Sequence, residues 1–252
     1  MRNEVATFLL ALQFITRIPI GGAKVYTPER MAASVRYYPL VGALIGAICT
    51  LIFWWSLFLF PTGVSVIFAI AAGLLLTGAF HEDGLADTFD GIGGGLSREK
   101  ALEIMKDSRL GTYGTLALII ALAVKVGALI TLPNALIAAA LITGHSLSRV
   151  SSVLTIATSR YVRDEGTGKP VAGGISRTSL AVTVLSAALI MAFWCYVIVP
   201  VALLWAIGGL LIGHILIRLF FEPKLGGYTG DTLGAVQQAS EIGFYIGLVA
   251  WL

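Results

Sequence analysis

The chain has 252 residues, of which 57% are hydrophobic and 12% are charged, and its formal net charge is +3 at pH 7. Because a typical soluble domain is about 25% charged, this composition excludes an ordinary soluble protein. The small net charge gives no reason to expect a nucleic-acid partner. We therefore predict an all-α, polytopic membrane protein, with residues 1–252 forming one helix-bundle domain.

Apolar runs predict where the chain crosses the membrane. Six runs can span a hydrocarbon core of roughly 30 Å, and they lie at 38–60, 63–80, 111–132, 135–157, 179–199 and 201–221. A seventh run at 233–252 is weaker, because its first half contains Gln237, Gln238, Ser240 and Glu241. The N-terminal run 5–20 contains Gln13 and Arg17, which predicts an interfacial or half-length helix.

The connections between these runs differ in charge. The turns at 61–63, 133–134 and around Pro200 carry no charged residue, whereas the other connections hold nearly all of the Lys, Arg, Asp and Glu. If the runs alternate in direction, the charged connections all lie on one side, which the positive-inside rule makes cytoplasmic. We expect a multi-pass protein of the bacterial inner membrane with its polar segments in the cytoplasm.

The segment 81–91, HEDGLADTFDG, contains four carboxylates within nine residues: Glu82, Asp83, Asp87 and Asp90. If it is helical, the three aspartates share one face at i, i+4 and i+7. Clustered carboxylates usually need a hard divalent cation, and Mg²⁺ at such sites commonly holds phosphates. We therefore predict that all four carboxylates bind Mg²⁺ in a cytoplasmic active-site loop over 81–110, beside His81 as a substrate contact. The alternative is a solvated acidic loop next to the membrane.

A glycine run, 93–95, follows the acidic segment. Backbone N–H groups in such a run can approach phosphate, so Gly94 and Gly95 are candidate substrate contacts. The run lacks the Gly-Lys-Ser/Thr ending of a nucleotide-binding P-loop. A hinge between two short helices is an equally good explanation.

The segment 105–114, MKDSRLGTYG, lies where the chain re-enters the membrane. Lys106 and Arg109 are candidate phosphate contacts, Asp107 is a further candidate metal ligand, and Tyr113 is a candidate substrate contact. Interfacial anchoring by the basic residues and Tyr113 is the alternative, but it does not explain the Asp-Ser pair or the two glycines.

A polar stripe runs down one face of the predicted span 135–157. It consists of His145, Ser148, Arg149, Ser152, Thr155 and Ser159. A charge inside a span costs about 2.5–3.5 kcal/mol, so it normally faces a cavity or a partner. We expect the stripe to line a water-filled cleft open to the cytoplasm, in which His145 and Arg149 contact substrate. In the alternative, the Arg149 side chain extends to the membrane interface and His145 is hydrogen-bonded within the bundle. Lys125 is a lone charge in the span 111–132, and we interpret it as snorkelling to the interface.

The segment 225–234, LGGYTGDTLG, places Asp231 and Thr229 at the entrance of the last helix. Asp231 either caps this helix or faces Asp83 across the cleft as a metal ligand or general base. Thr229 is a candidate substrate contact. We expect Asp83, Asp87 and Asp231 to be the catalytic carboxylates of a metal-assisted phosphoryl reaction, since the chain has no Gly-x-Ser-x-Gly, His-Glu-x-x-His or zinc-ligand spacing.

Three segments in this order, HEDGLADTFDGIGGG, MKDSRLGTYG and LGGYTGDTLGA, resemble the signatures of the cobalamin synthase family of adenosylcobinamide-GDP ribazoletransferases. QFITRIP and YYPLVGALIG also fit, so the resemblance covers nearly the whole chain. It implies a Mg²⁺-dependent enzyme of the inner membrane that joins adenosylcobinamide-GDP to α-ribazole or its 5′-phosphate. GMP leaves, and adenosylcobalamin or its 5′-phosphate forms. Membrane lipid, other cobalamin-pathway enzymes and a second copy of the chain are candidate partners.

Two other classes of function are alternatives. An ion-coupled transporter would use Asp83, Arg149 and Glu241 as a relay, but it should place ionisable residues at mid-membrane and use both faces. A membrane scaffold for cobalamin-pathway enzymes would tolerate alanine at Asp83 and Asp87.

Overall fold

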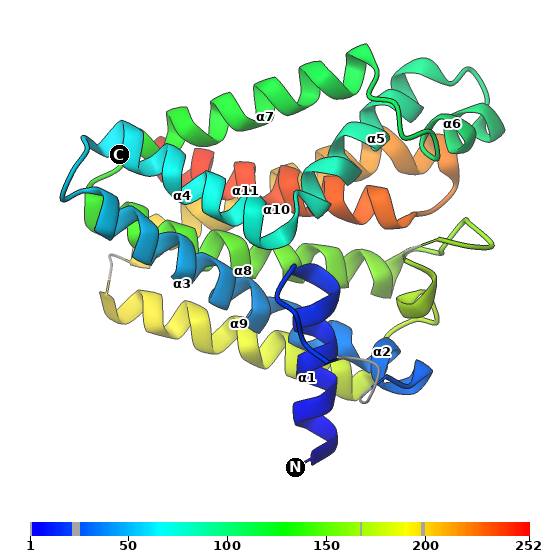
Figure 1. Cartoon of the computed structure of the whole chain (residues 1–252), viewed down its shortest axis with the longest axis horizontal. Helices are drawn as coiled ribbons and strands as arrows, with labels where there is room; N and C mark the ends of the chain where they lie inside the picture. The colour runs from blue at the N-terminus through cyan, green and yellow to red at the C-terminus, as the bar shows by residue number, and fades with distance from the viewer. Residues whose placement is uncertain (1, 22–25, 167, 198–199) are drawn as a thin grey trace.

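The computed structural model describes residues 2–21, 26–166, 168–197 and 200–252, and they form a helical bundle (Figure 1). The predicted all-α class is confirmed. The helices are α1 (Arg2–Ile15), α2 (Pro28–Ser34), α3 (Tyr38–Ser56), α4 (Thr62–Thr77), α5 (Phe80–Gly94), α6 (Arg98–Ile104), α7 (Thr112–Ile130), α8 (Asn134–Thr158), α9 (Arg177–Val197), α10 (Pro200–Leu225) and α11 (Gly230–Trp251). Within the described ranges, β-type pairing is limited to one isolated bridge between Tyr161 and Tyr228.

Within the described residues, five helical stretches are long and apolar enough to cross a membrane: Pro28–Ser56, Thr112–Ile130, Asn134–Thr158, Arg177–Trp194 and Pro200–Leu225. They agree with five of the six strong predicted spans, except that residues 198–199 lie outside the described part of the chain. The N-terminal run forms α1, which is 14 residues long and therefore the predicted half-length helix.

The remaining predicted span, 63–80, is present as α4 but ends earlier than predicted. Helix α4 has 16 residues and ends at Thr77, and its C-cap is Gly78, whose φ of 65° is in the left-handed region that favours glycine. Ala79 is also left-handed, and α5 departs at 86° to α4. A Cβ at Gly78 would collide with the Arg17 side chain, so this corner is closely packed. The 81–110 segment, expected to be a loop, is therefore mostly the two helices α5 and α6.

The weaker seventh predicted span is α11, which lies at the centre of the bundle against α5, α7, α8 and α10. Its polar side chains, Gln237, Gln238, Ser240 and Glu241, are all buried. Glycines allow the close approach, because a Cβ at Gly209 or Gly213 of α10 would meet the α11 backbone. A Cβ at Gly42 or Gly46 of α3 would meet α8 in the same way, as expected for small-residue packing in membranes.

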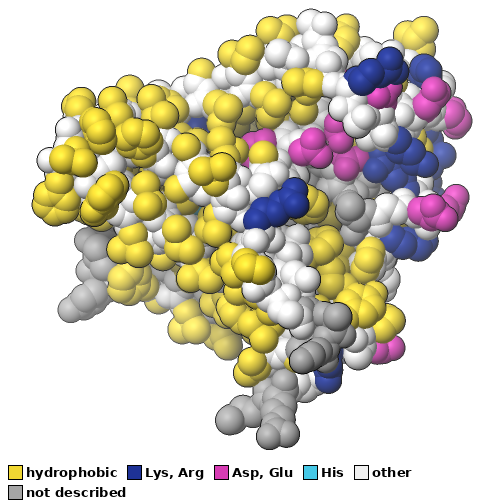
Figure 2. Space-filling view, in the orientation of Figure 1, with side chains coloured by type: hydrophobic (Ala, Val, Ile, Leu, Met, Phe, Trp, Pro, Cys, Tyr) yellow, Lys and Arg dark blue, Asp and Glu magenta, His cyan; other side chains and the backbone are white. Residues whose placement is uncertain are grey.

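The bundle has a polar end and a bare end. In Figure 1 the α5–α6 region, the loop after α8 and the α10–α11 turn lie together at the right, whereas the α3–α4 and α7–α8 turns lie at the left. The hydroxyl of Thr62 donates to the Asn134 side chain at 3.3 Å, which joins those two bare turns. Figure 2 shows most visible charged side chains at the same right-hand end and a largely hydrophobic surface over the rest of this face. This separation agrees with the charge pattern of the connections.

Candidate active site at the polar end

Two carboxylates of α5 are accessible to solvent. Asp83 is exposed and Asp87 is half-buried, one helical turn apart on the predicted shared face. Neither carboxylate has a hydrogen-bond or ion-pair partner among the described residues. Asp231 and Arg163 are close enough to act electrostatically on Asp87. Asp83 and Asp87 are thus free acceptors on adjacent turns.

Asp90 is on the same face but is used differently. Its two oxygens accept the N–H groups of Gly111 (2.7 Å) and Gly114 (2.8 Å), at the start of α7. A Cβ at either glycine would collide with the Asp90 carboxylate. This explains the two glycines of MKDSRLGTYG, and it places Asp90 as the anchor of a helix N-terminus, where a carboxylate is stabilised.

Asp231 reaches the same region from α11. Gly84 of α5 packs against the Asp231 backbone, since a Cβ there would lie 2.5 Å from the Asp231 carbonyl oxygen. The N-cap of α11 is Thr229, whose buried hydroxyl accepts the Thr232 N–H at 3.2 Å. The capping explanation for Asp231 is therefore wrong, and the Thr229 hydroxyl is occupied by the cap. Asp231 instead pairs with Arg163, with Nη1 2.7 Å from Oδ2.

These carboxylates suit Mg²⁺ as part of a shared site. Among the described residues, no three His, Cys, Asp or Glu side chains are grouped to hold a metal ion by themselves. Mg²⁺ is usually bound by one or two carboxylates together with substrate phosphates and water, and seldom by a full protein cage. The free carboxylates of Asp83 and Asp87 match that requirement.

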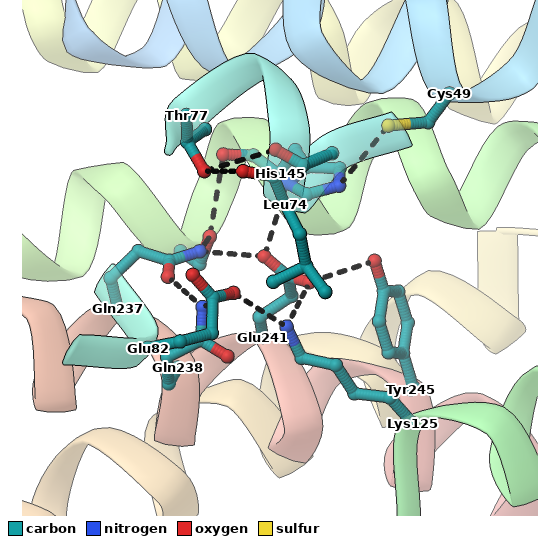
Figure 3. Close-up of polar contacts among 12 residues, drawn as sticks. Cys49, Leu74, Thr77, Glu82, Lys125, His145, Gln237, Gln238, Glu241 and Tyr245 are labelled. Carbon is teal, nitrogen blue, oxygen red and sulfur yellow. Dashed lines mark hydrogen bonds and ion pairs between the residues drawn. The ribbon is translucent and has the colours of Figure 1, made fainter. Parts of the chain in front are cut away.

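Glu82 belongs to a different cluster inside the bundle (Figure 3). It accepts a hydrogen bond from Gln238 at 2.8 Å and lies 3.9 Å from the Lys125 ammonium. Lys125 in turn lies 2.8 Å from Glu241, and the Glu241 carboxylate lies 3.2 Å from His145. The predicted ligand Glu82 is thus on the side of α5 that faces the core, away from Asp83.

The polar stripe of α8 faces this cluster and not an open cleft. Arg149 is 2% exposed and donates to the His145 carbonyl at 2.6 Å. The cavity beside His81, His145 and Arg149 has a volume of about 20 Å³, room for a single water. The prediction of a water-filled cleft is therefore wrong, because Glu241 and the side chains that contact it, Lys125 and Gln237, occupy the space. Lys125 is 4% exposed and paired, so the snorkelling interpretation is also wrong.

The remaining predicted contacts lie around α6. Gly95 packs against Ala101 and Gly93 against the Tyr113 ring, so the glycine run allows close packing between helices, while Gly94 is exposed. Arg109 and Asp107 pair with each other at the surface, and the Arg109 hydrogen bond lowers the pKa of Asp107 to about 2. The structure does not bring Asp107 into contact with the free carboxylates.

The cobalamin-5-phosphate synthase family model matches residues 7–249. The chain belongs to this family. Curated relatives named adenosylcobinamide-GDP ribazoletransferase include one from Shewanella frigidimarina, 42% identical over 98% of this chain and 95% of the relative. Another, from Shewanella woodyi, is 42% identical over 100% of this chain and 98% of the relative. A third, from Leptothrix cholodnii, is 43% identical over 98% of this chain and 96% of the relative. No solved structure matches the chain.

The resemblance drawn from the sequence is therefore confirmed at the level of the cobalamin-5-phosphate synthase family. The structure adds one residue to its candidate site that the sequence did not single out, Arg163. In the sequence it is one of several basic residues in the loop after α8, and only the fold places it against Asp231.

Proposed function

We propose that the chain is an adenosylcobinamide-GDP ribazoletransferase. It joins adenosylcobinamide-GDP to α-ribazole or its 5′-phosphate and releases GMP. The observation that carries the proposal is a pair of carboxylates, Asp83 and Asp87, which have no partner among the described residues and interact electrostatically with Asp231, in a chain whose relatives carry this name. Phosphoryl transfer requires positioning and charge neutralisation, which such an arrangement can provide.

The reaction exchanges one P–O bond for another. The ribazole hydroxyl oxygen attacks the phosphorus attached to cobinamide, and the bridging P–O bond to GMP breaks. The hydroxyl proton passes to a carboxylate, for which we assign Asp231 Oδ1, because Oδ2 is paired with Arg163. Gly84, by its close approach to Asp231, sets the separation between α5 and α11 on which this geometry depends.

Asp83 and Asp87 are the residues that would hold Mg²⁺. When bound, the ion neutralises charge on the pyrophosphate and on the leaving GMP. Asp90 contributes by fixing α7 against α5. We assign no ligand role to Glu82, whose carboxylate faces Lys125 and Gln238.

We place the protein in the bacterial inner membrane with the polar end in the cytoplasm. The support is the concentration of Lys and Arg at that end, together with the positive-inside rule. The test is cysteine labelling in a chain without Cys49 and Cys195. A membrane-impermeant thiol reagent added from outside should not label cysteines at the exposed positions 94 and 166. Cysteines at 62 and 134 should react, and periplasmic labelling of position 94 would reverse the topology.

The test of the activity is GMP release by the purified protein in liposomes supplied with adenosylcobinamide-GDP. We expect release that requires both α-ribazole and Mg²⁺ and that yields one cobalamin product per GMP. Absence of ribazole-dependent release would favour a scaffold. The transporter alternative has less support, because Glu241 is held by Lys125, His145 and Gln237 and is not free to relay ions.

A further inference from the structure

An open cleft of about 610 Å³ lies at the polar end, between the start of α6, the loop after α8 and the end of α10. Its charged lining residues among the described part of the chain are Arg98, Arg160, Arg163, Lys169 and Lys224, against one carboxylate, Asp164. Its volume is within the range of small-molecule sites, about 300–1,000 Å³. Five cations against one anion favour an anionic ligand.

Two guanidinium groups of the cleft are held in place by backbone carbonyls. Arg98 Nε donates to the Leu225 carbonyl at 2.8 Å, and Arg160 Nε donates to the Gly226 carbonyl at 2.7 Å. The terminal nitrogens of both side chains have no hydrogen-bond partner among the described residues. Anchoring at Nε leaves these paired donors available for the bidentate contacts that arginine makes with phosphate.

A third guanidinium connects the cleft to the carboxylates. The Arg163 side chain is 9% exposed, and its Nη1 pairs with Asp231. Its Nε and Nη2 are buried without a hydrogen-bond partner in the described structure. Buried charged donors without acceptors are costly, so an acceptor from a ligand or water is expected to reach them.

The floor of the cleft is formed by two chain segments paired side by side. The Val162 N–H donates to the Tyr228 carbonyl at 3.0 Å, and the Tyr228 N–H donates to the Arg160 carbonyl at 2.8 Å. Gly226 has a φ of 71°, and a Cβ at Gly227 would strike the Arg160 carbonyl oxygen. The Tyr161 ring lines the cleft, with the Lys169 ammonium 6.0 Å from its centre. Gly226 and Gly227 thus allow the two segments to approach closely, which places Arg160 and the Tyr161 ring in the lining of the same cleft.

We propose that this cleft binds the guanosine phosphate half of the substrate, the half that leaves as GMP. The inference rests on the proposed function, and it assigns a place to a substrate group that the carboxylates alone do not locate. The cations would contact the nucleotide phosphate, Tyr161 would face the nucleoside, and Arg163 would adjoin both this phosphate and Asp231. The pyrophosphate would then extend from the cleft toward Asp83 and Asp87.

Phosphate also occurs in ribazole 5′-phosphate and in anionic lipid headgroups, so the test must separate these sources. The first arm measures the Kd of GMP for the purified chain in nanodiscs of phosphatidylcholine. The second arm adds ribazole 5′-phosphate as competitor, and the third arm replaces part of the lipid by phosphatidylglycerol. We expect neither change to raise the Kd of GMP more than twofold.

The variants are Arg160→Gln, Arg98→Gln and Lys169→Glu. Each should raise the Kd of GMP about tenfold or more, as loss of a charge-assisted contact predicts. Lys169 is exposed, and the contact described for its ammonium is with the Tyr161 ring, so Lys169→Glu tests the site while leaving the backbone hydrogen bonds of this turn in place. Lys100→Ala is the matched control, because Lys100 is on α6 near Arg98 but pairs with Glu103. It should bind GMP like the unmodified chain.

The proposal is overturned if all three variants bind GMP as tightly as the unmodified chain does. It is also overturned if ribazole 5′-phosphate or phosphatidylglycerol displaces GMP and the three variants abolish this displacement. That result would mean that the cleft binds the phosphate of the competitor and not that of GMP. GMP binding is measured without turnover. A chain that binds GMP in the cleft but shows no ribazole-dependent GMP release would therefore refute the proposed activity and leave the nucleotide site in place.

Discussion

The Arg163 guanidinium and the Asp231 carboxylate form an ion pair in which Nη1 lies 2.7 Å from Oδ2. Their side chains are 9% and 16% exposed, so both charges are largely removed from water. The pair joins the loop after α8 to the first turn of α11. It therefore fixes the distance between the basic cleft and the free carboxylates of α5.

Replacing Arg163 by glutamine should reduce both stability and activity. Asp231 would be left without its counter-charge, which should lower the free energy of unfolding by about 1.5–3 kcal/mol. We expect ribazole-dependent GMP release to fall at least tenfold. The double variant Arg163→Gln with Asp231→Asn should recover stability but not activity, as a thermal-unfolding cycle in detergent would show. If the loss of stability in the double variant equals the sum of the losses in the two single variants, Arg163 and Asp231 do not interact energetically, which would contradict the ion pair as a stabilising contact.

Asp90→Ala should destabilise the protein by about 1–2 kcal/mol, as loss of a helix-capping carboxylate does. The reason is that Gly111 and Gly114 would lose the acceptor for their N–H groups. Glu103→Gln is the control, since Glu103 is a 70% exposed carboxylate on nearby α6. An Asp90→Ala chain that unfolds at the same temperature as the control would show that Asp90 does not anchor α7.

Gly84→Ala should lower activity by separating α5 from α11. The new methyl group would lie 2.5 Å from the Asp231 carbonyl oxygen, so the helices must move apart and shift Asp231 relative to Asp87. Gly127→Ala on α7 is the matched control, because a Cβ at Gly127 has no neighbour within 4 Å. We expect normal GMP release from the control and a loss of at least tenfold from Gly84→Ala. Equal rates would show that this contact does not position the site.

The buried cluster around Glu241 predicts a stability effect without a direct role in the reaction. Lys125→Met leaves Glu241 buried with a partner missing, which should cost about 3–5 kcal/mol of unfolding free energy. Adding Glu241→Gln should restore much of the loss, because the uncompensated charge is removed. Lys100→Met serves as the surface control. A Lys125→Met chain as stable as that control would mean that the pair contributes nothing.

Much of the fold follows from the order of apolar runs, since a span must satisfy its backbone within one helix. The predicted span 63–80 is found as α4, but it ends three residues early, because hydropathy does not register the left-handed backbone of Gly78 and Ala79. The snorkelling interpretation of Lys125 fails because its partner Glu241 is 116 positions away in the sequence, so no local pattern shows the pair. Pairings of this kind depend on the packing of α7, α8 and α11, which no local pattern encodes.

The candidate site was predicted in part for the same reason. Helical spacing correctly placed Asp83 and Asp87 on one face, because both belong to one helix. The cap formed by Asp90 depends on the position of α7, and the pairing of Asp231 depends on where the loop carrying Arg163 returns. Both require contacts between segments far apart in the sequence.

The most direct measurement of the central claim is the rate of ribazole-dependent GMP release by Asp83→Asn and Asp87→Asn in liposomes. Glu103→Gln is assayed beside them as the exposed-carboxylate control. If the two free carboxylates provide the electrostatic stabilisation of the reaction, each variant should lose about a hundredfold or more in rate while folding normally, and the control should be unchanged. Turnover by both aspartate variants within twofold of the control would contradict the assignment of the reaction to this site.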